Sequence, residues 1–325
     1  MSENAVPAPD GERQTGRDRP DLEVAALPLP ASGFDEFTYP RYAPLLSASP
    51  SAADSEERIA VAAWNEGRPA GLAFLSRSSP ENARRLLSIM VSPDLRGKNV
   101  GSRLLALAEE CARARGTMKL LAIHTSDLPA RAAYESLMRK AGWSAPVPFE
   151  FRAGGKAGWS LLALNDWAPF LERLHRRGFA ATGWDALTEA DREEIADIVK
   201  NAVPEDDRDF DPFQGEQRLP IIPELSIVLR RHGEIVGWIL GSKGAVPNSV
   251  YYSHGYVLPL LQRAGWLACG VREISQRQAE SLGSESLCVF ETAATNTGMR
   301  RFMEQHLKPY SLWTHWRYSC EKRLE

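Results

Sequence analysis

The chain has 325 residues, which is long for one domain and sufficient for two of ordinary size. Hydrophobic residues make up 43% and charged residues 25%, as in soluble globular proteins, and no run of eighteen apolar residues predicts a membrane span. The formal net charge of -3 argues against a general nucleic-acid binder, which is normally basic.

The four cysteines are widely spaced, and they form neither a CxxC pair nor a dense disulfide framework. They are Cys111, Cys269, Cys288 and Cys320. The N-terminus also lacks a positively charged stretch followed by an apolar one, so we expect no secretory signal. The sequence therefore predicts reduced thiols, a cytoplasmic location and no metal site, while it leaves the oligomeric state open.

The first half of the chain predicts an alternation of strands and helices behind a polar tail. Residues 1–20 have almost nothing to bury, which predicts disorder. The segment 34–46 is aromatic and broken by proline, which indicates short helices or an irregular loop. Hydrophobic spacing predicts strands over 22–27, 58–64, 69–75, 85–91, 119–125, 147–152 and 159–164, and helices over 102–115 and 130–140.

A linking helix is predicted over 166–177, and after it the order of elements starts again. The second half predicts strands over 179–187, 225–231, 235–241, 250–258, 286–293 and 312–320, and helices over 191–201, 265–282 and 297–306. Thr188 and Asp191 are placed to cap the first of these helices. This recurrence predicts an α/β fold with a mixed sheet in two tandem domains, 21–165 and 178–325.

The strongest local signal is Val-Ser-Pro-Asp-Leu-Arg-Gly-Lys-Asn-Val-Gly-Ser over residues 91–102, between a hydrophobic strand and an amphipathic helix. The start of a helix exposes main-chain N–H groups and carries about half a positive charge, so it favours an anion. Gly97 and Gly101 let the backbone approach a phosphate closely, and Arg96 and Lys98 add positive charge.

This segment resembles the pyrophosphate loop of the GCN5-related N-acetyltransferase (GNAT) family, which has the form Arg/Gln-x-x-Gly-x-Gly/Ala between a strand and a helix. The residues that fit it are Arg96, Gly97, Lys98, Val100, Gly101 and Ser102. Asn99 stands where the family usually has glycine, and asparagine is the other residue that best tolerates left-handed backbone.

The resemblance continues downstream and covers residues 58–165. The family has Asn-x-x-Ala after the next strand, then a helix that bears a tyrosine, then Gly-Phe. Here Asp127 replaces the asparagine, Tyr134 matches the tyrosine, and Gly142-Trp143 matches the last pair.

The resemblance implies two tandem GNAT-like acyl-CoA N-acyltransferase folds, with acetyl-CoA or another acyl-CoA as the donor. It implies that a primary amine attacks the thioester directly, that a strand N–H near Met90 or Val91 stabilises the oxyanion, and that Tyr134 protonates the departing thiolate. The implied cofactor-binding residues are Met90, Val91, Arg96, Gly97, Lys98, Asn99, Val100, Gly101, Ser102 and Asp127.

The second half matches the same pattern less well. Gln262 falls at the position of Arg96 and Gly265 at that of Asn99, but Leu267 falls at that of Gly101, where its side chain would obstruct a phosphate. Asn296 corresponds to Asp127, and Phe302 and Met303 surround the place of Tyr134. We interpret this half as a diverged copy.

Several alternatives stay open at this point. The protein is a non-catalytic acyl-CoA sensor, or it takes a longer acyl group, from CoA or an acyl-carrier protein, and modifies a peptide amine. The general base is undecided among Glu66, Asp94 and His124, and the acceptor is a small-molecule or peptide amine. Tyr134 has a purely structural alternative, a core tyrosine. The aromatic residues Phe34, Phe37, Tyr39 and Tyr42 line an acceptor pocket or only pack on the sheet.

Overall fold

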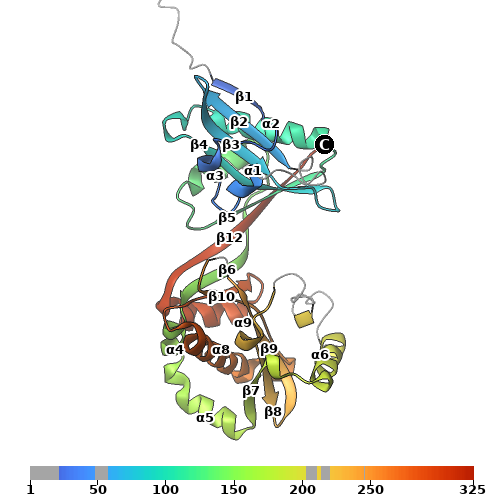
Figure 1. The fold of residues 1–325 in the computed structure, drawn as a ribbon, viewed down its shortest axis with the longest axis vertical. Helices are drawn as coiled ribbons and strands as arrows, with labels where there is room; N and C mark the ends of the chain where they lie inside the picture. Colours follow the sequence, from blue (N-terminus) through green and yellow to red (C-terminus); the bar gives the residue numbers. More distant parts are fainter. Residues whose placement is uncertain (1–21, 48–57, 203–210, 214–219, 245) are drawn as a thin grey trace, which may run out of the picture. The chain divides into compact units, whose positions relative to one another are not determined.

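The computed structural model describes residues 22–47, 58–202, 211–213, 220–244 and 246–325, so the predicted tail over 1–20 lies outside the described residues. The chain forms two compact units, each built from more than one stretch of sequence (Figure 1). Unit 1 comprises Met1–Ile123, Ala130–Pro146 and Ser319–Glu325, and unit 2 comprises His124–Pro129 and Val147–Tyr318.

The strands of unit 1 follow one another in sequence order. They are β1 (Leu22–Ala26), β2 (Ile59–Asn65), β3 (Arg68–Leu75), β4 (Ala83–Val91) and β5 (Lys119–Thr125), and the end of β12 (Ser311–Arg323) lies next to β5. Neighbours from β1 to β4 are antiparallel, whereas β4 and β5 are parallel. The tight turn between β2 and β3 has positive φ at both Glu66 and Gly67. Glycine therefore occupies only one of the two positions at which this hairpin turn requires left-handed backbone.

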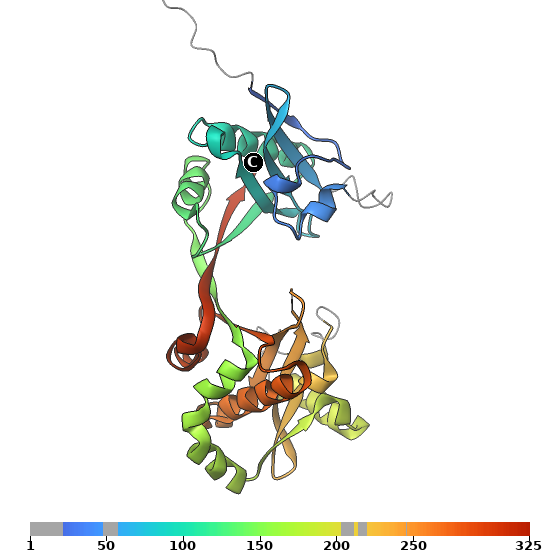
Figure 2. The ribbon, with the colours of Figure 1, turned by 60° about the vertical axis from the view of Figure 1, so that its left-hand side comes forward.

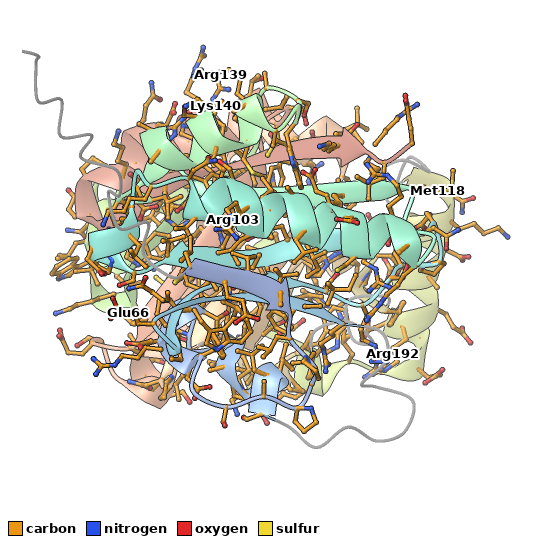
Figure 3. The ribbon with its side chains drawn as sticks, turned by 90° about the horizontal axis from the view of Figure 1, so that it is seen from above. Glu66, Arg103, Met118, Arg139, Lys140 and Arg192 are labelled. Carbon is orange, nitrogen blue, oxygen red and sulfur yellow. The ribbon has the colours of Figure 1, made fainter. Side chains whose placement is uncertain are left out.

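Helices cover both faces of the unit 1 sheet. On one face, α2 (Val100–Ala114) buries Leu104, Leu105, Ala108 and Ala112, which form one stripe at helical spacing. The helix α3 (Arg131–Lys140) contributes to the same apolar cluster; Figure 3 labels Arg103 on α2 and Arg139 and Lys140 at the end of α3. On the other face, the 3-10 turn Asp35–Phe37 and α1 (Ala43–Ser47) bury aromatic and leucine side chains.

A buried carboxylate ties the end of β12 to the rest of unit 1. Glu109 is only 6% exposed, and it accepts hydrogen bonds from the Trp143 indole at 2.7 Å and from the Lys322 ammonium group. Removing one partner of a buried ion pair leaves the other desolvated and unpaired. The Lys322 ammonium group also donates to the Ala141 carbonyl. This second hydrogen bond would remain if Glu109 were replaced, so it limits the loss of stability.

We therefore expect Glu109→Ala to lower the free energy of unfolding by about 2–3 kcal/mol. Urea denaturation followed by circular dichroism measures this. Glu110→Ala is the matched control, because Glu110 is the exposed neighbour on the same helix and should change stability by less than about 0.5 kcal/mol. Equal effects of the two substitutions would contradict the assigned role.

Unit 2 repeats this architecture. Its strands are β6 (Val147–Lys156), β7 (Phe179–Gly183), β8 (Ile227–Arg231), β9 (Glu234–Lys243), β10 (Ser249–Val257) and β11 (Leu287–Ala293), in the spatial order β12-β6-β11-β10-β9-β8-β7. Its helices are α4 (Ala157–Ala163), α5 (Ala168–Arg176), α6 (Glu189–Ala202), α8 (Trp266–Leu282) and α9 (Thr297–Phe302). The succession β8-β9-β10-α8-β11 has the pairing directions of β2-β3-β4-α2-β5, so the predicted recurrence is confirmed.

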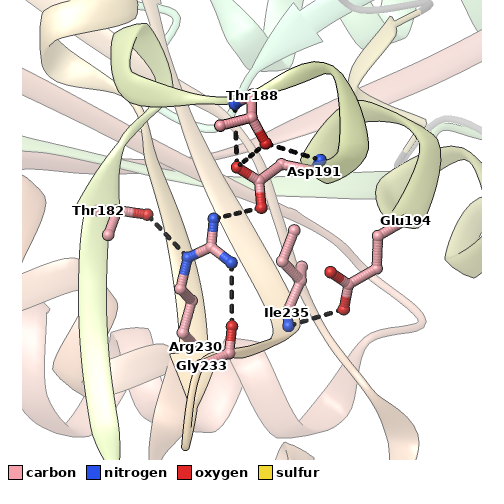
Figure 4. Close-up of polar contacts among 7 residues, drawn as sticks. All are labelled: Thr182, Thr188, Asp191, Glu194, Arg230, Gly233 and Ile235. Carbon is pink, nitrogen blue, oxygen red and sulfur yellow. Dashed lines mark hydrogen bonds and ion pairs between the residues drawn. The ribbon is translucent and has the colours of Figure 1, made fainter.

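The predicted cap of α6 is also present. The Asp191 carboxylate accepts from the main-chain N–H of Thr188 at 2.9 Å, and the Thr188 hydroxyl accepts from the N–H of Asp191 at 3.2 Å (Figure 4). This reciprocal pair is a capping box. Arg230 of β8 adds an ion pair to Asp191 at 2.7 Å, and these bonds lower the pKa of the Asp191 carboxyl to about 2.

Two predictions differ from the structure. Residues 159–164 were expected to form a strand, but they lie mainly in the helix α4, where Ala157, Ser160 and Ala163 are buried at a spacing of three residues. The compact units also differ from the predicted domain bounds. Because β6 pairs with β11 from Glu150 to Lys156, residues 147–165 join unit 2, while Ser319–Glu325 joins unit 1.

Candidate active site

The segment that carries the strongest sequence signal leaves β4 and enters α2 through an ordered loop. Leu95 is buried and anchors the 3-10 turn Pro93–Leu95. Gly97 has a φ of 77° and Asn99, the N-cap of α2, has a φ of 66°. The expectation that asparagine supplies left-handed backbone at this position is therefore confirmed.

The start of α2 is open to solvent. Gly97 and Asn99 are exposed, and a Cβ built on Gly97 would meet no atom within 4 Å. No side chain caps the helix at Asn99, so the first-turn N–H groups remain available to an anion. Arg96 donates from Nε to the Val91 carbonyl at 3.2 Å, and it is exposed on the same loop as Lys98. This arrangement provides positive charge around unsatisfied main-chain donors.

Val100, Gly101 and Ser102 contribute in different ways. The Val100 side chain is 1% exposed and belongs to the apolar core, so only its main chain faces the loop. Gly101 and Ser102 are half-buried. A Cβ built on Gly101 would lie 3.6 Å from Leu137 and 3.8 Å from Val91, so α3 lies beside the start of α2.

The strands β4 and β5 separate next to this loop. Their parallel pairing runs from Ala83 with Lys119 to Leu86 with Ala122. Among the described residues it ends there, although β4 continues to Val91. The register between β3 and β4 shifts at the same point, with Leu87 as the extra residue of a bulge. The end of β4 therefore has main-chain groups that β5 does not pair.

The register identifies which of these groups face the gap. Ser92 donates its N–H to the Ala70 carbonyl of β3 at 2.9 Å. In an antiparallel ladder such bonding residues alternate, so Met90 also faces β3, whereas the N–H groups of Ile89 and Val91 point away from it. For the main-chain donor, the register therefore favours Val91 over Met90, and it adds Ile89 as a candidate that the sequence analysis did not name. Because alternate residues of a strand point their N–H groups to the same side, the sequence position two before Val91 would have identified Ile89.

Tyr134 lies on α3, one turn before Leu137, which lies beside Gly101, so it belongs to the helix next to the start of α2. Its side chain is half-buried. Burial raises the pKa of the Tyr134 phenol above its ordinary value, and the neighbouring Cys320 and Tyr39 act in the same direction. The phenol is therefore neutral at physiological pH and can donate a proton. Burial also raises the pKa of Cys320, to about 11, so this residue stays a thiol.

The other predicted polar residues are less closely linked to the loop. Asp127 belongs to unit 2, where its carboxylate lies 3.7 Å from Nδ1 of His315. His124 also belongs to unit 2 and is buried, and its ring stacks on that of Tyr318 with 5.4 Å between the ring centroids. Asp94 is exposed and bonded to Ser92, and neither Asp94 nor His124 gains a feature of a general base.

The aromatic segment 34–46 lies on the opposite face of β4 from α2. Thr38 and Ser88 are both buried and share a hydrogen bond of 2.8 Å between their hydroxyls, which ties the segment to β4 beside the bulge. Tyr42 packs in the same cluster as Met90, and the Arg41 guanidinium lies over the Tyr42 ring at 4.7 Å. The segment thus presents aromatic and cationic groups next to the gap, although its sequence alone did not place it there.

No group of three or more His, Cys, Asp or Glu side chains that could hold a metal ion is found in the described part of the chain. Among the same residues, no helix is both long enough and apolar enough to cross a bilayer. All four cysteines are free thiols.

Comparison with known proteins identifies a family for part of the chain and a fold for most of it. Residues 24–138 match the family described as the acetyltransferase (GNAT) family. The chain is similar to the solved structure of a tandem GNAT protein from the clavulanic acid biosynthesis pathway, with a TM-score of 0.56 and 14% identity over 94% of this chain and 99% of that one. The comparison with curated proteins finds no match.

Two further solved structures have the same fold. A GCN5-related N-acetyltransferase from Sphaerobacter thermophilus has a TM-score of 0.59 and 17% identity, over 94% of this chain and 97% of that one. A GCN5-related glucosamine N-acetyltransferase region of a fungal multi-domain β-N-acetylglucosaminidase has a TM-score of 0.60 and 14% identity, over 94% of this chain and 38% of that one. At these identities the likeness concerns the fold.

Proposed function

We propose that unit 1 is an N-acetyltransferase. The premise is that residues 24–138 match the acetyltransferase (GNAT) family and that the chain has the fold of tandem GNAT proteins. Unit 1 transfers an acetyl or other acyl group from acyl-CoA to a primary amine, by direct attack in a ternary complex. The observation that carries this proposal is the open, uncapped start of α2 beside the gap between β4 and β5.

The donor pyrophosphate binds at the start of α2 in this proposal. Its oxygens accept hydrogen bonds from the main chain of residues 97–101, and Arg96 and Lys98 neutralise part of its charge. The hydroxyl of Ser102 is a further hydrogen-bond donor to the pyrophosphate. We leave Asp127 out of the donor site, because its carboxylate lies 3.7 Å from Nδ1 of His315.

The thioester lies in the gap at the end of β4. There the N–H groups of Ile89 and Val91 face away from β3, and a main-chain N–H aimed at the carbonyl oxygen stabilises the negative charge that develops on it. Because these donors are held by the sheet, they need no reorganisation during the reaction. Positioning of amine and thioester supplies the rest of the acceleration.

Tyr134 is the proposed general acid. As the amine nitrogen bonds to the carbonyl carbon, the carbon–sulfur bond breaks and the sulfur of CoA leaves with the electron pair. The neutral phenol donates its proton to this sulfur. The raised pKa of Tyr134 ensures that the proton is present across the physiological pH range.

The acceptor enters from the face that bears Tyr39, Arg41 and Tyr42. A lysine-like amine has a pKa of about 10.4, so it is mostly protonated at neutral pH and must lose a proton before it attacks. We assign no residue as the base, and water carries the proton away. The acceptor is a small-molecule or peptide amine; nucleic acid, membrane and metal have no part in this proposal, and we place the reaction in the reducing cytoplasm, where free thiols persist.

A thiol-release assay over a panel of amines, combined with CoA binding, tests the proposal. We expect amine-dependent release of CoA from acetyl-CoA. Binding of CoA without release for any amine would instead support a sensor. A donor panel of acetyl-CoA, long acyl-CoA and acyl-carrier protein separates the remaining alternative, since a carrier-bound pantetheine lacks the adenosine phosphates that the start of α2 would hold.

A further inference from the structure

Unit 2 repeats the main-chain frame of the candidate donor site. The register between β9 and β10 shifts between Tyr252 and His254, and the parallel pairing of β10 with β11 ends at Tyr252 and Phe290. In unit 1 the bulge of β4 and the end of its parallel pairing also coincide, at Leu86 and Ala122. Both units therefore have a gap between the strands that flank their central helix.

The loop after the strand is repeated as well. Gln262 donates from Nε2 to the Val257 carbonyl at 3.1 Å, as Arg96 does at the end of β4. Gly265 has a φ of 80° and is the N-cap of α8, the position that Asn99 has in α2. The backbone of unit 2 thus keeps the geometry that unit 1 uses to present helix N–H groups.

A phenylalanine ring fills this place in unit 2. A Cβ built on Gly265 would lie 2.4 Å from Cε1 and Cζ of Phe170, so the ring of this α5 residue lies directly against the backbone at the start of α8. Both views show α5 beside α8 (Figures 1 and 2). At the equivalent position of unit 1, Asn99 is exposed, and two residues before it a Cβ built on Gly97 would meet no atom within 4 Å.

An aromatic cluster holds the Phe170 ring in position. Trp167 meets Phe170 edge-on at 5.7 Å between ring centroids, and it meets Phe302 and His306 at 5.9 and 5.0 Å. The Arg173 guanidinium lies 5.6 Å from the Phe170 centroid. Phe302, near the place of Tyr134, has no hydroxyl to donate. An anion at this helix start would lose its water against apolar rings, which is costly.

Leu267 closes the strand side of the same place. It stands in α8 where Gly101 stands in α2, and its Cδ1 would lie 3.2 Å from a Cβ built on Gly255. Leu258 donates its N–H to the Val236 carbonyl at 2.9 Å, so by the alternation of the ladder the N–H of Gly255 faces away from β9. Leu267 therefore lies over the residue that corresponds to Ile89 of the proposed oxyanion site.

We infer that the chain binds a single acyl-CoA, and that Phe170 and Leu267 close the equivalent site in unit 2. The inference of one bound acyl-CoA per chain rests on the proposed function of unit 1, whereas the closure of unit 2 rests on contacts within unit 2. The ligand that these contacts exclude from unit 2 is the pyrophosphate of CoA.

Two measurements on the unmodified chain test this inference. Isothermal titration with CoA should give one site per chain. Hydrogen exchange with and without CoA should show added protection over residues 96–103 and no change over residues 262–269. A second CoA per chain, or protection at the start of α8, overturns the inference whatever the activity of unit 1.

Opening the closed site gives the converse test. In the double variant Phe170→Ala, Leu267→Gly we expect a second CoA to bind, with new protection over residues 262–269. Leu260→Gly is the matched control, because Leu260 is 97% exposed in the same loop, and it should leave the count at one. A double variant that melts as a folded protein and still binds one CoA overturns the assignment of closure to these two side chains.

The outcomes separate the two proposals. If the unmodified chain binds no CoA, the donor site of unit 1 is wrong, while the double variant should still gain one site in unit 2. If the unmodified chain binds one CoA but the protection falls on residues 262–269, both proposals fail. Gly101→Leu combined with the double variant should bind one CoA, in unit 2 alone.

Discussion

Gly101→Leu is expected to weaken CoA binding at least about 100-fold, which corresponds to about 2.7 kcal/mol. Side chains on a helix tilt toward its N-terminus, so a leucine at the second residue of α2 would extend over the loop that holds the phosphates. A Cβ alone at this position makes ordinary contacts with Leu137 and Val91. Gly101→Ala should therefore weaken binding much less than the leucine.

This loss should occur without a loss of stability. Leucine is a better helix former than glycine by about 0.8 kcal/mol, and α8 already carries Leu267 at the equivalent position. Titration with CoA measures the affinity, and thermal unfolding checks the fold. Ala106→Leu, which adds a similar side chain on the exposed face of α2, is the control and should bind CoA normally. Unchanged affinity in Gly101→Leu would show that the pyrophosphate binds elsewhere.

Tyr134→Phe is expected to lower kcat by about 100- to 1000-fold, with little change in the Kd for CoA. The phenylalanine keeps the packing of the ring and removes only the proton donor. Steady-state release of CoA with a good amine acceptor measures kcat. Tyr310→Phe is the control, because Tyr310 is exposed and lies in unit 2, and it should leave kcat unchanged.

The dependence on leaving group and on pH distinguishes a proton donor from a packing residue. A thioester with a more acidic thiol needs less protonation, so Tyr134→Phe should lose less activity with it. In the unmodified protein the raised pKa keeps the Tyr134 phenol protonated as pH increases. Activity should therefore rise with the free-amine fraction and show no decline due to this group up to about pH 10. Equal losses with both thioesters would exclude the acid role.

Features that depend on neighbours in sequence could be predicted from the sequence. Asn99 tolerates left-handed backbone, so the loop into α2 keeps its course without the usual glycine. Thr188 and Asp191 are three residues apart, which is the spacing of a capping box. The stripe of apolar residues on α2 and the recurrence of strand, helix and strand in both halves are periodic patterns of the same kind.

Other features depend on contacts between residues far apart in the chain. The segment 157–163 is short and mostly apolar, so the spacing of its apolar residues does not distinguish a strand from a helix. Packing in the tertiary structure selects the helix α4. The alternation in a strand does not name its partner, so only the tertiary structure assigned β6 to unit 2 and Ser319–Glu325 to unit 1. Which N–H groups of β4 face the gap follows from the register with β3.

The contrast between the two halves shows the same division. The sequence by itself determined that both halves have the strand-loop-helix frame and that Leu267 replaces a glycine in the second. It could not place the Phe170 ring on Gly265, because these residues lie on different elements with no periodic relation between them. Only packing in three dimensions decided that one helix start is open and the other closed, since each depends on which distant side chain fills the space in front of it.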